Sequence, residues 1–310
     1  MPPPKGYDAA AYGRDIAIFR SFVKQAMPDM MILGPGSVGE GIPLLGAFPL
    51  LRSEDLLTAT GSVFDAFSYH FYGAVSQRGA AMMPEAATTP AAALSEDWLS
   101  RTDTVEAFYA GLRDTFEPGK PLWITETADA ACGGNPWAST FLDSFRYLDQ
   151  LGRLAQRGVR VVIHNTLASS DYGLLDERTL APRPNYWAAL LWRRLMGTMV
   201  LNPGPSPVPS LHLYAHCLPD HPGGVTLLVI NTDRRVSQEL AIPVQADRYT
   251  LTTNDLQRSK ILLNGSELSV GAGGDLPRLT GAPTQAGKVV FAPTSITFLA
   301  MPGAKNSSCR

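Results

Sequence analysis

Glu126 is the carboxylate that the sequence places best for chemistry. It lies near the end of a short apolar stretch, residues 121–127, which alternates like a strand and leads into the small residues of 128–134. Regular alternation puts Leu122, Ile124 and Glu126 on one face of this strand. A carboxylate at the C-terminal end of a buried strand is typical of the catalytic face of an α/β barrel. The alternative is an ordinary surface glutamate that closes a strand.

Other polar residues also stand at or after predicted strand ends. In residues 63–72, alternation puts Ser68, His70 and Tyr72 on one face and aromatic residues on the opposite, helix-packing face. If the strands form a parallel barrel, their polar ends converge at one mouth. The converging residues would be Glu40, His70, Tyr72, Glu126, Asn165, Asp171 and Tyr172. Such a site suits glycoside hydrolysis, in which one carboxylate attacks or stabilises the anomeric carbon and a second protonates the leaving oxygen.

The elements that must position these residues alternate between helices and strands. Helices are predicted at 8–26, 53–60, 95–116, 139–157 and 184–196, and strands at 30–33, 63–72, 121–127 and 159–163. The last of these strands is a β-branched run, typical of a strand buried on both faces. The repeated order of helix and strand favours parallel βα units over an antiparallel fold.

A proline-rich segment at 202–210 marks a change in the pattern. Short strands with turn residues between them follow, at 211–216, 225–230, 238–242, 249–252, 260–263 and 295–299. This pattern predicts a β-sandwich of roughly 100 residues. The predicted domains are therefore 1–200 and 201–310.

The composition of the 310-residue chain excludes several classes of protein. Apolar residues are 45% and charged residues 17%, so the chain can bury a core and is not disordered. A net charge of −2 without a basic run excludes nucleic acid and anionic membrane as general partners. No apolar stretch is long enough to span a membrane, and the N-terminus shows no signal peptide. Nucleotide-binding and serine-hydrolase motifs are absent, so no cofactor is expected.

No metal site is predicted from the histidines of the second half or from the three cysteines. His212 and His216 share a strand face about 13 Å apart, too far to chelate one ion, and are interpreted as surface or packing residues. Cys132 has no Cys or His at ligand spacing. Cys217 and Cys309 could form a bridge that closes a loop of about 90 residues. The alternative is two thiols in a cytosolic protein.

Four spaced motifs carry a resemblance to a known family. They are W-I-T-E-T-A-D-A-A-C-G-G, F-x-x-S-F-R-Y-L-D-Q-L-G, V-V-I-H-N-T-L-A-S-S-D-Y-G-L-L-D and P-N-Y-W-A-A-L-L-W-R-R-L-M-G-T. From about residue 10 onward, the chain resembles the heparanase and β-glucuronidase group, glycoside hydrolase family 79. L-x-L-Y-A-H-C and Cys309 fall where heparanases carry a disulfide. The resemblance implies a (β/α)8 barrel beside a β-sandwich, a retaining mechanism, a glucuronic-acid-containing oligo- or polysaccharide as partner, and an extracellular or cell-surface location.

The resemblance also implies roles for particular residues. Glu126 matches the nucleophile. Tyr172, with backbone N–H groups of the loop 132–134, matches the groups that grip the uronic acid carboxylate, because small residues let backbone donors approach an anion. Cys132 stands where heparanases often have another glycine. The residues so assigned to substrate binding are His70, Tyr72, Cys132, Gly133, Gly134, Asn165, Asp171 and Tyr172.

One motif of the family does not occur in this sequence. The acid/base glutamate lies in Asn-Glu-Pro at the end of the fourth barrel strand, and the chain has no such tripeptide. We therefore expect the C-terminal portion of such an enzyme, from a truncated gene model or a fragment: a partial (β/α)8 TIM-type barrel of about four βα units, then the sandwich. Without the proton donor, ordinary glycosides should be cleaved about 10²–10⁴-fold more slowly. The alternative function is a catalytically incompetent carbohydrate-binding or vestigial protein.

Overall fold

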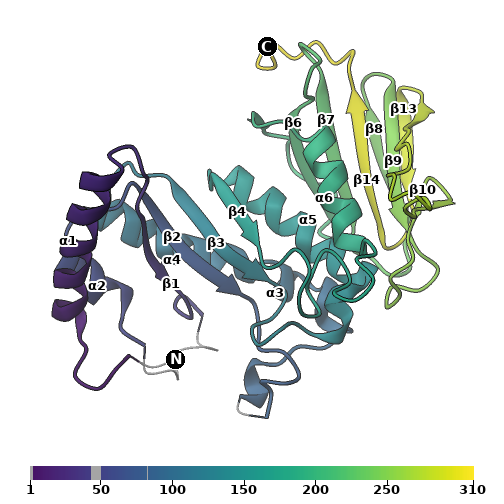
Figure 1. The fold of residues 1–310 in the computed structure, drawn as a ribbon. Coiled ribbons are helices and arrows are strands. Elements are labelled where there is room, and N and C mark those ends of the chain that lie inside the picture. The colour runs from purple at the N-terminus through teal and green to yellow at the C-terminus, as the bar shows by residue number, and fades with distance from the viewer. Residues whose placement is uncertain (1–2, 43–49, 82) are drawn as a thin grey trace. The chain divides into compact units, whose positions relative to one another are not determined.

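The computed structural model describes residues 3–42, 50–81 and 83–310 (Figure 1). They form two compact units. The first unit comprises Met1–Ala87, Ser100–Ala131 and Arg157–Asn165. The second unit comprises Thr88–Leu99, Cys132–Gln156 and Thr166–Arg310. The predicted domain boundary at residue 200 stays a prediction.

The first unit is built on a four-stranded parallel sheet. Its strands lie in chain order: β1 (Leu33–Ser37), β2 (Ala66–Tyr72), β3 (Leu122–Ala128) and β4 (Val161–His164). The helices of this unit are α1 (Ala9–Ala26), α2 (Ser53–Thr60) and α4 (Arg101–Phe116), with the short 3₁₀ helix η2 (Pro84–Ala86). The predicted parallel βα order is therefore confirmed for these strands. The predicted strand at 30–33 was placed too early, because the paired residues are those of Leu33–Ser37.

Aromatic packing holds the central strand β2 against helix α4. Tyr69 stacks on Tyr109 with ring centroids 4.6 Å apart, and Phe67 lies 6.2 Å from the same ring. All three side chains are fully buried. The aromatic face predicted for β2 is thus its helix-packing face. The opposite face carries Ser68, His70 and Tyr72.

Strand β4 differs from the prediction of a strand buried on both faces. Val161 and Val162 are only partly buried, and Ile163 is 45% exposed. Among the strands that the structure describes, β4 pairs with β3 alone, so it is an edge strand. A run of β-branched residues favours a strand but does not say how many neighbours cover it.

Strand β3 contains one more residue than its neighbours at the level of Thr125. Tyr69 and His70 are adjacent, but their partners in β3 are Ile124 and Glu126. The pairing with β4 shows the same irregularity between Ile124 and Thr127. Such a bulge reverses the alternation of the residues that follow it. The prediction that Glu126 shares a face with Leu122 and Ile124 was therefore wrong.

The second unit is a layered antiparallel structure. Its large sheet has the order β11-β10-β9-β14-β7-β6-β5, with β12 paired to β9, and its small sheet is β13-β8. The strands are β5 (Val200–Leu201), β6 (Leu211–Cys217), β7 (Val225–Asn231), β8 (Gln238–Ile242), β9 (Ala246–Thr252), β10 (Leu262–Leu263), β11 (Ser266–Glu267), β12 (Ala282–Thr284), β13 (Gly287–Phe291) and β14 (Ser295–Met301). Side chains of both sheets, such as Leu213, Val229, Ile242 and Phe291, share one core, so the sheets pack as a sandwich.

Helices cover the other face of the large sheet. The helices of this unit are α3 (Glu96–Leu99), α5 (Phe141–Gln156) and α6 (Pro184–Leu195), with 3₁₀ helices η3 (Ala92–Leu94) and η4 (Pro136–Ser139). Phe145 of α5 and Trp187 of α6 share a core with Leu228 and Phe298 of the sheet. A disulfide joins Cys217 at the end of β6 to Cys309. None of the helices in the described part of the chain has the length and hydrophobicity of a membrane span.

Candidate active site

Glu126 lies near the C-terminal end of β3, where two side chains of the neighbouring strand β2 contact it. Its side chain is 39% exposed, so the carboxylate is accessible to solvent. The hydroxyl of Tyr72 donates a short hydrogen bond to its Oε1 atom. His70 presents Nδ1 at 3.8 Å from Oε2. The carboxylate is therefore held from one side by β2 and open on another.

Asn165 extends this arrangement beyond β4. Its side-chain amide donates to the hydroxyl of Tyr72 at 2.9 Å, and its backbone N–H donates to the carbonyl of Thr127 at 2.8 Å. Because a phenolic hydroxyl has one hydrogen and can also accept, Tyr72 can accept from Asn165 while donating to Glu126. We call the four side chains of His70, Tyr72, Glu126 and Asn165 the carboxylate cluster. The structure thus brings these four predicted residues together.

The bulge at Thr125 explains how Glu126 reaches this cluster. With regular alternation, Glu126 would lie on the buried, helix-packing face with Leu122 and Ile124. The extra residue puts Glu126 opposite His70, on the face that also carries Tyr72. Bulges of this kind often re-aim a side chain beside an active site. The apolar pattern of the sequence carried no signal for this irregularity.

Electrostatics leave His70 uncharged at neutral pH. Its partial burial lowers the pKa of the imidazole, and the nearby Glu126 carboxylate opposes this shift without cancelling it. A neutral imidazole can donate or accept one hydrogen bond at each ring nitrogen, depending on the tautomer. Within the described part of the chain, no lysine or arginine forms an ion pair with Glu126. A carboxylate of this kind can act as a nucleophile or stabilise a developing positive charge.

The remaining predicted binding residues belong to the second unit. Cys132, Gly133 and Gly134 have positive φ angles of 65°, 89° and 79°. Glycine adopts this conformation at little cost, whereas Cys132 pays a steric penalty for it. The backbone N–H of Asp171 donates to the carbonyl of Gly133 at 3.0 Å. The structure therefore ties the loop 132–134 to the segment that carries Asp171 and the buried Tyr172.

Arg183 holds the Asp171 segment in place and was not anticipated from the sequence. Its Nη1 atom lies within hydrogen-bond distance of the carbonyl oxygens of Ser170, Asp171 and Gly173, at 2.8, 2.9 and 3.3 Å. Its Nη2 atom also contacts Asp176 at 3.3 Å. One guanidinium with several donors can fix successive carbonyls of a turn. An arginine just before a helix-starting proline shows no such role in sequence.

The carboxylate of Glu40 is hydrogen-bonded at the start of helix α2. It accepts hydrogen bonds from the backbone N–H and the hydroxyl of Ser53, the first residue of α2. A carboxylate at this position satisfies donors that the helix leaves unpaired and favours its positive end. Glu40 therefore supports the first turn of α2, and its place among the residues that converge at the mouth of the barrel stays a prediction. The described residues contain no group of three or more His, Cys, Asp or Glu that could hold a metal ion.

Comparison with curated proteins finds relatives over most of the chain, although no family model matches it. Heparanase-like protein 1 of Arabidopsis thaliana is 29% identical over 97% of this chain and 61% of its own length. Mouse heparanase is 30% identical over 97% of this chain and 57% of its own length. The baicalin-β-D-glucuronidase of Scutellaria baicalensis is 33% identical over 65% of this chain and 40% of its own length. The chain spans about three fifths of the first two proteins.

Comparison with solved structures finds the same fold at lower sequence identity. A family 51 arabinofuranosidase of Xanthomonas axonopodis has a TM-score of 0.63 and 17% identity, over 95% of this chain and 63% of that one. A rhamnosyl-β-D-glucuronidase of Fusarium oxysporum 12S has a TM-score of 0.64 and 13% identity, over 95% and 65%. Over the part that it covers, the chain thus has the fold of a class of glycoside hydrolases. Within that class, it is a homologue of the heparanase and β-glucuronidase group.

Proposed function

We propose that this chain is the C-terminal portion of a retaining glycoside hydrolase that cleaves glucuronide linkages, with Glu126 as the nucleophile. The parallel strands of the first unit would be about four βα units of a (β/α)8 barrel. The observation that carries the proposal is the carboxylate cluster, in which an accessible carboxylate is oriented by Tyr72 and Asn165 and lies beside a neutral His70. The relatives that are named heparanase and β-glucuronidase support the substrate class.

In the proposed first step, an oxygen of Glu126 attacks the anomeric carbon of a glucuronide. The bond between that carbon and the leaving oxygen breaks, its electron pair goes to the leaving oxygen, and a glycosyl ester forms on Glu126. Water then attacks the same carbon, the bond between that carbon and the ester oxygen breaks, its electron pair returns to the Glu126 carboxylate, and the proton that the water loses passes to the solvent. Tyr72 orients the attacking group and, in the free enzyme, stabilises its negative charge. We assign the proton donor to no residue of this chain.

The proposed binding of the sugar uses the second group of residues. Backbone N–H groups of the loop 132–134 and the hydroxyl of Tyr172 would bind the carboxylate of the uronic acid, because preformed donors suit an anion. Asn165 and Asp171 would contact sugar hydroxyls at the rim. The partner would be a glucuronic-acid-containing oligo- or polysaccharide outside the cell. The Cys217–Cys309 disulfide supports that location, because disulfides persist in oxidising compartments.

A trapping experiment tests the proposal directly. A 2-fluoro-glucuronyl fluoride carries a leaving group that needs no proton, and its fluorine at C2 slows hydrolysis of the glycosyl ester. We expect mass spectrometry to find the sugar on the peptide that contains Glu126. The variant Glu126→Gln should remain unlabelled, whereas Glu267→Gln, a change at an exposed residue of β11, should label like the natural chain.

Two outcomes would contradict the proposal. Labelling of a different carboxylate would remove Glu126 from the role of nucleophile. A chain that binds glucuronate in calorimetry but is never labelled would be a carbohydrate-binding protein without catalytic activity. The second outcome would favour the alternative function.

A further inference from the structure

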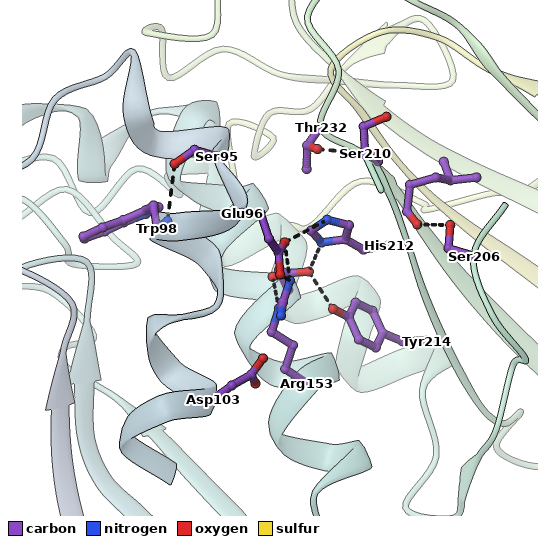
Figure 2. A network of polar contacts seen from close by, with 12 residues as sticks. Ser95, Glu96, Trp98, Asp103, Arg153, Ser206, Ser210, His212, Tyr214 and Thr232 are labelled. Atoms are coloured by element: carbon purple, nitrogen blue, oxygen red, sulfur yellow. Dashed lines mark hydrogen bonds and ion pairs between the residues drawn. The ribbon is translucent and has the colours of Figure 1, made fainter. Parts of the chain in front are cut away.

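A cluster of charged and polar side chains joins strand β6 to helices α3 and α5 within the second unit (Figure 2). We call it the His212 cluster, and it consists of Glu96, Asp149, Arg153, His212 and Tyr214. Figure 2 shows the side chains of Glu96, Arg153, His212 and Tyr214 pointing toward one another. None of them belongs to the proposed catalytic or sugar-binding residues.

Asp149 is the centre of the cluster and is completely buried. Its Oδ1 atom contacts Nδ1 of His212 at 2.5 Å and accepts from the hydroxyl of Tyr214 at 2.6 Å. Its Oδ2 atom accepts from Nε of Arg153 at 2.6 Å. A buried carboxylate is costly unless it is paired and hydrogen-bonded, and Asp149 is both.

Both ring nitrogens of His212 face carboxylates. Nδ1 contacts Asp149, while Nε2 lies 3.5 Å from Oε2 of Glu96. A neutral imidazole has one N–H donor, whereas an imidazolium has two. Carboxylates that carry charge only accept. Only the protonated ring can therefore donate to Asp149 and also present a positive charge and an N–H group toward Glu96.

The charges of the cluster balance when His212 is protonated. Glu96 and Asp149 supply two negative charges, and Arg153, which contacts both carboxylates, supplies one positive charge. Protonated His212 supplies the second positive charge. Loss of its proton removes one positive charge from beside a buried aspartate, which is unfavourable in a region of low dielectric.

We propose that His212 is a proton-operated clamp, which fastens β6 to α3 and α5 most tightly under mildly acidic conditions. The proposal is independent of the proposed catalytic function. The stability of the second unit should therefore rise as the pH falls from alkaline to neutral values. The folded chain takes up a proton at His212 at a pH at which the unfolded chain has released it.

Electrostatics agree with the geometry. Burial alone would lower the pKa of His212, but the charge and hydrogen bond of Asp149, with help from Glu96, raise it above the ordinary value in spite of Arg153. The pKa of Asp149 is lowered, because the charges of His212 and Arg153 and the hydrogen bonds of His212 and Tyr214 outweigh burial. Stabilisation by His212 is fully present below its unfolded pKa of about 6.5 and is lost as the pH rises through the folded value.

Other histidines act in the opposite direction. The pKa values of His70 and His216 are lowered, chiefly by burial. Their contributions to stability are present above about pH 6.5 and are lost as the pH falls. The pH dependence of the stability of the natural chain is therefore a sum of opposing contributions from these histidines. The contribution of His212 must be measured as a difference between variants.

A matched pair of variants measures that difference in the full chain. Glu96→Gln removes one charge that faces His212 but keeps an acceptor for Arg153. Glu239→Gln is the control, since Glu239 is equally exposed (54% against 57%) and is also in an ion pair, with Lys288. Thermal unfolding is followed from about pH 6 to about pH 8.5, on either side of the ordinary pKa of histidine.

We expect Glu96→Gln to change this pH dependence and the control to leave it unchanged. In the Glu96→Gln variant, the fall in Tm between about pH 6 and about pH 8.5 should be smaller by roughly 1–3 °C. Equal pH dependence in Glu96→Gln and in the natural chain would overturn the proposal.

A titration by NMR gives a second, direct measurement. The chain has five histidines, and in the natural chain one ring should titrate above about pH 6.5. The midpoint of the same ring should move down in Glu96→Gln and stay in place in Glu239→Gln. If no ring titrates above the ordinary value, the clamp does not exist.

Discussion

Tyr72 and Glu126 come from neighbouring parallel strands, and the tyrosine hydroxyl donates a hydrogen bond to the glutamate carboxylate. The amide of Asn165 donates to the same hydroxyl. The orientation of Glu126 therefore depends on β2, on β3 and on the residue that follows β4. This support comes from a neutral hydroxyl group.

The first prediction concerns this hydrogen bond. Tyr72→Phe removes the hydroxyl, so Glu126 loses its donor and part of its orientation. Activity on an activated aryl β-glucuronide should fall by about 10²-fold, the usual effect of a misplaced reacting group. The matched control is Tyr7→Phe, which also removes a hydroxyl that donates to a carboxylate, that of Asp15 at 2.7 Å. An equal loss of activity in both variants would contradict the prediction.

The second prediction concerns the pH dependence of stability at His70. Burial lowers the pKa of this imidazole in the folded chain. Its contribution to stability is present above the unfolded pKa of about 6.5 and is lost as the pH falls through the folded value. In His70→Gln, the loss of unfolding free energy between about pH 7 and about pH 5 should therefore be smaller. Urea titrations at several pH values measure the free energy of unfolding. The same pH dependence in His70→Gln and in the natural chain would contradict the prediction.

The third prediction concerns the disulfide. Cys217 and Cys309 are 92 residues apart in the sequence, and their bond restricts the unfolded chain. Cys309→Ser should lower the free energy of unfolding by about 4–5 kcal/mol in the loop-entropy model. Cys132→Ser, at an exposed cysteine outside the bond, is the control and should change stability little. Denaturation with and without a reducing agent gives the same comparison in the natural chain.

The fourth prediction concerns two glycines inside helices. A Cβ atom at Gly152 of α5 would lie 2.3 Å from the ring of Tyr214, whereas one at Gly111 of α4 would meet nothing within 4 Å. Gly152→Ala should therefore destabilise the chain by about 1–3 kcal/mol through overpacking. Gly111→Ala should stabilise it by up to about 1 kcal/mol, because alanine favours a helix. Chemical denaturation measures the change in the free energy of unfolding for both variants. A change of the same sign in both would contradict the prediction.

Much of the fold was predictable because apolar periodicity reports element type well. Residues 8–26 were predicted as a helix and form α1, and the stretch around Glu126 was predicted as a strand and forms β3. The helix predicted at 95–116 is divided into α3 and α4 by a turn at Ser100. The exposure of Ile163 was not predictable, because it depends on how many strands lie beside β4.

The carboxylate cluster was predictable in its members but not in its geometry. Residue types at strand ends pointed to His70, Tyr72, Glu126 and Asn165, and parallel pairing brings them together. The bulge at Thr125 left no mark on the apolar pattern. His212 was interpreted as a surface or packing histidine, and its partners were missed because Asp149 and Glu96 lie more than fifty residues away in the sequence.

The additional residue in β3 has a consequence for protein engineering. If Thr125 were deleted, regular alternation would turn the glutamate toward the face of Leu122 and Ile124, where burial would suppress its charge. A designer who transplants this strand into another scaffold must therefore copy the irregular spacing along with the acidic side chain. Without the additional residue, the grafted carboxylate would face the buried side of the strand.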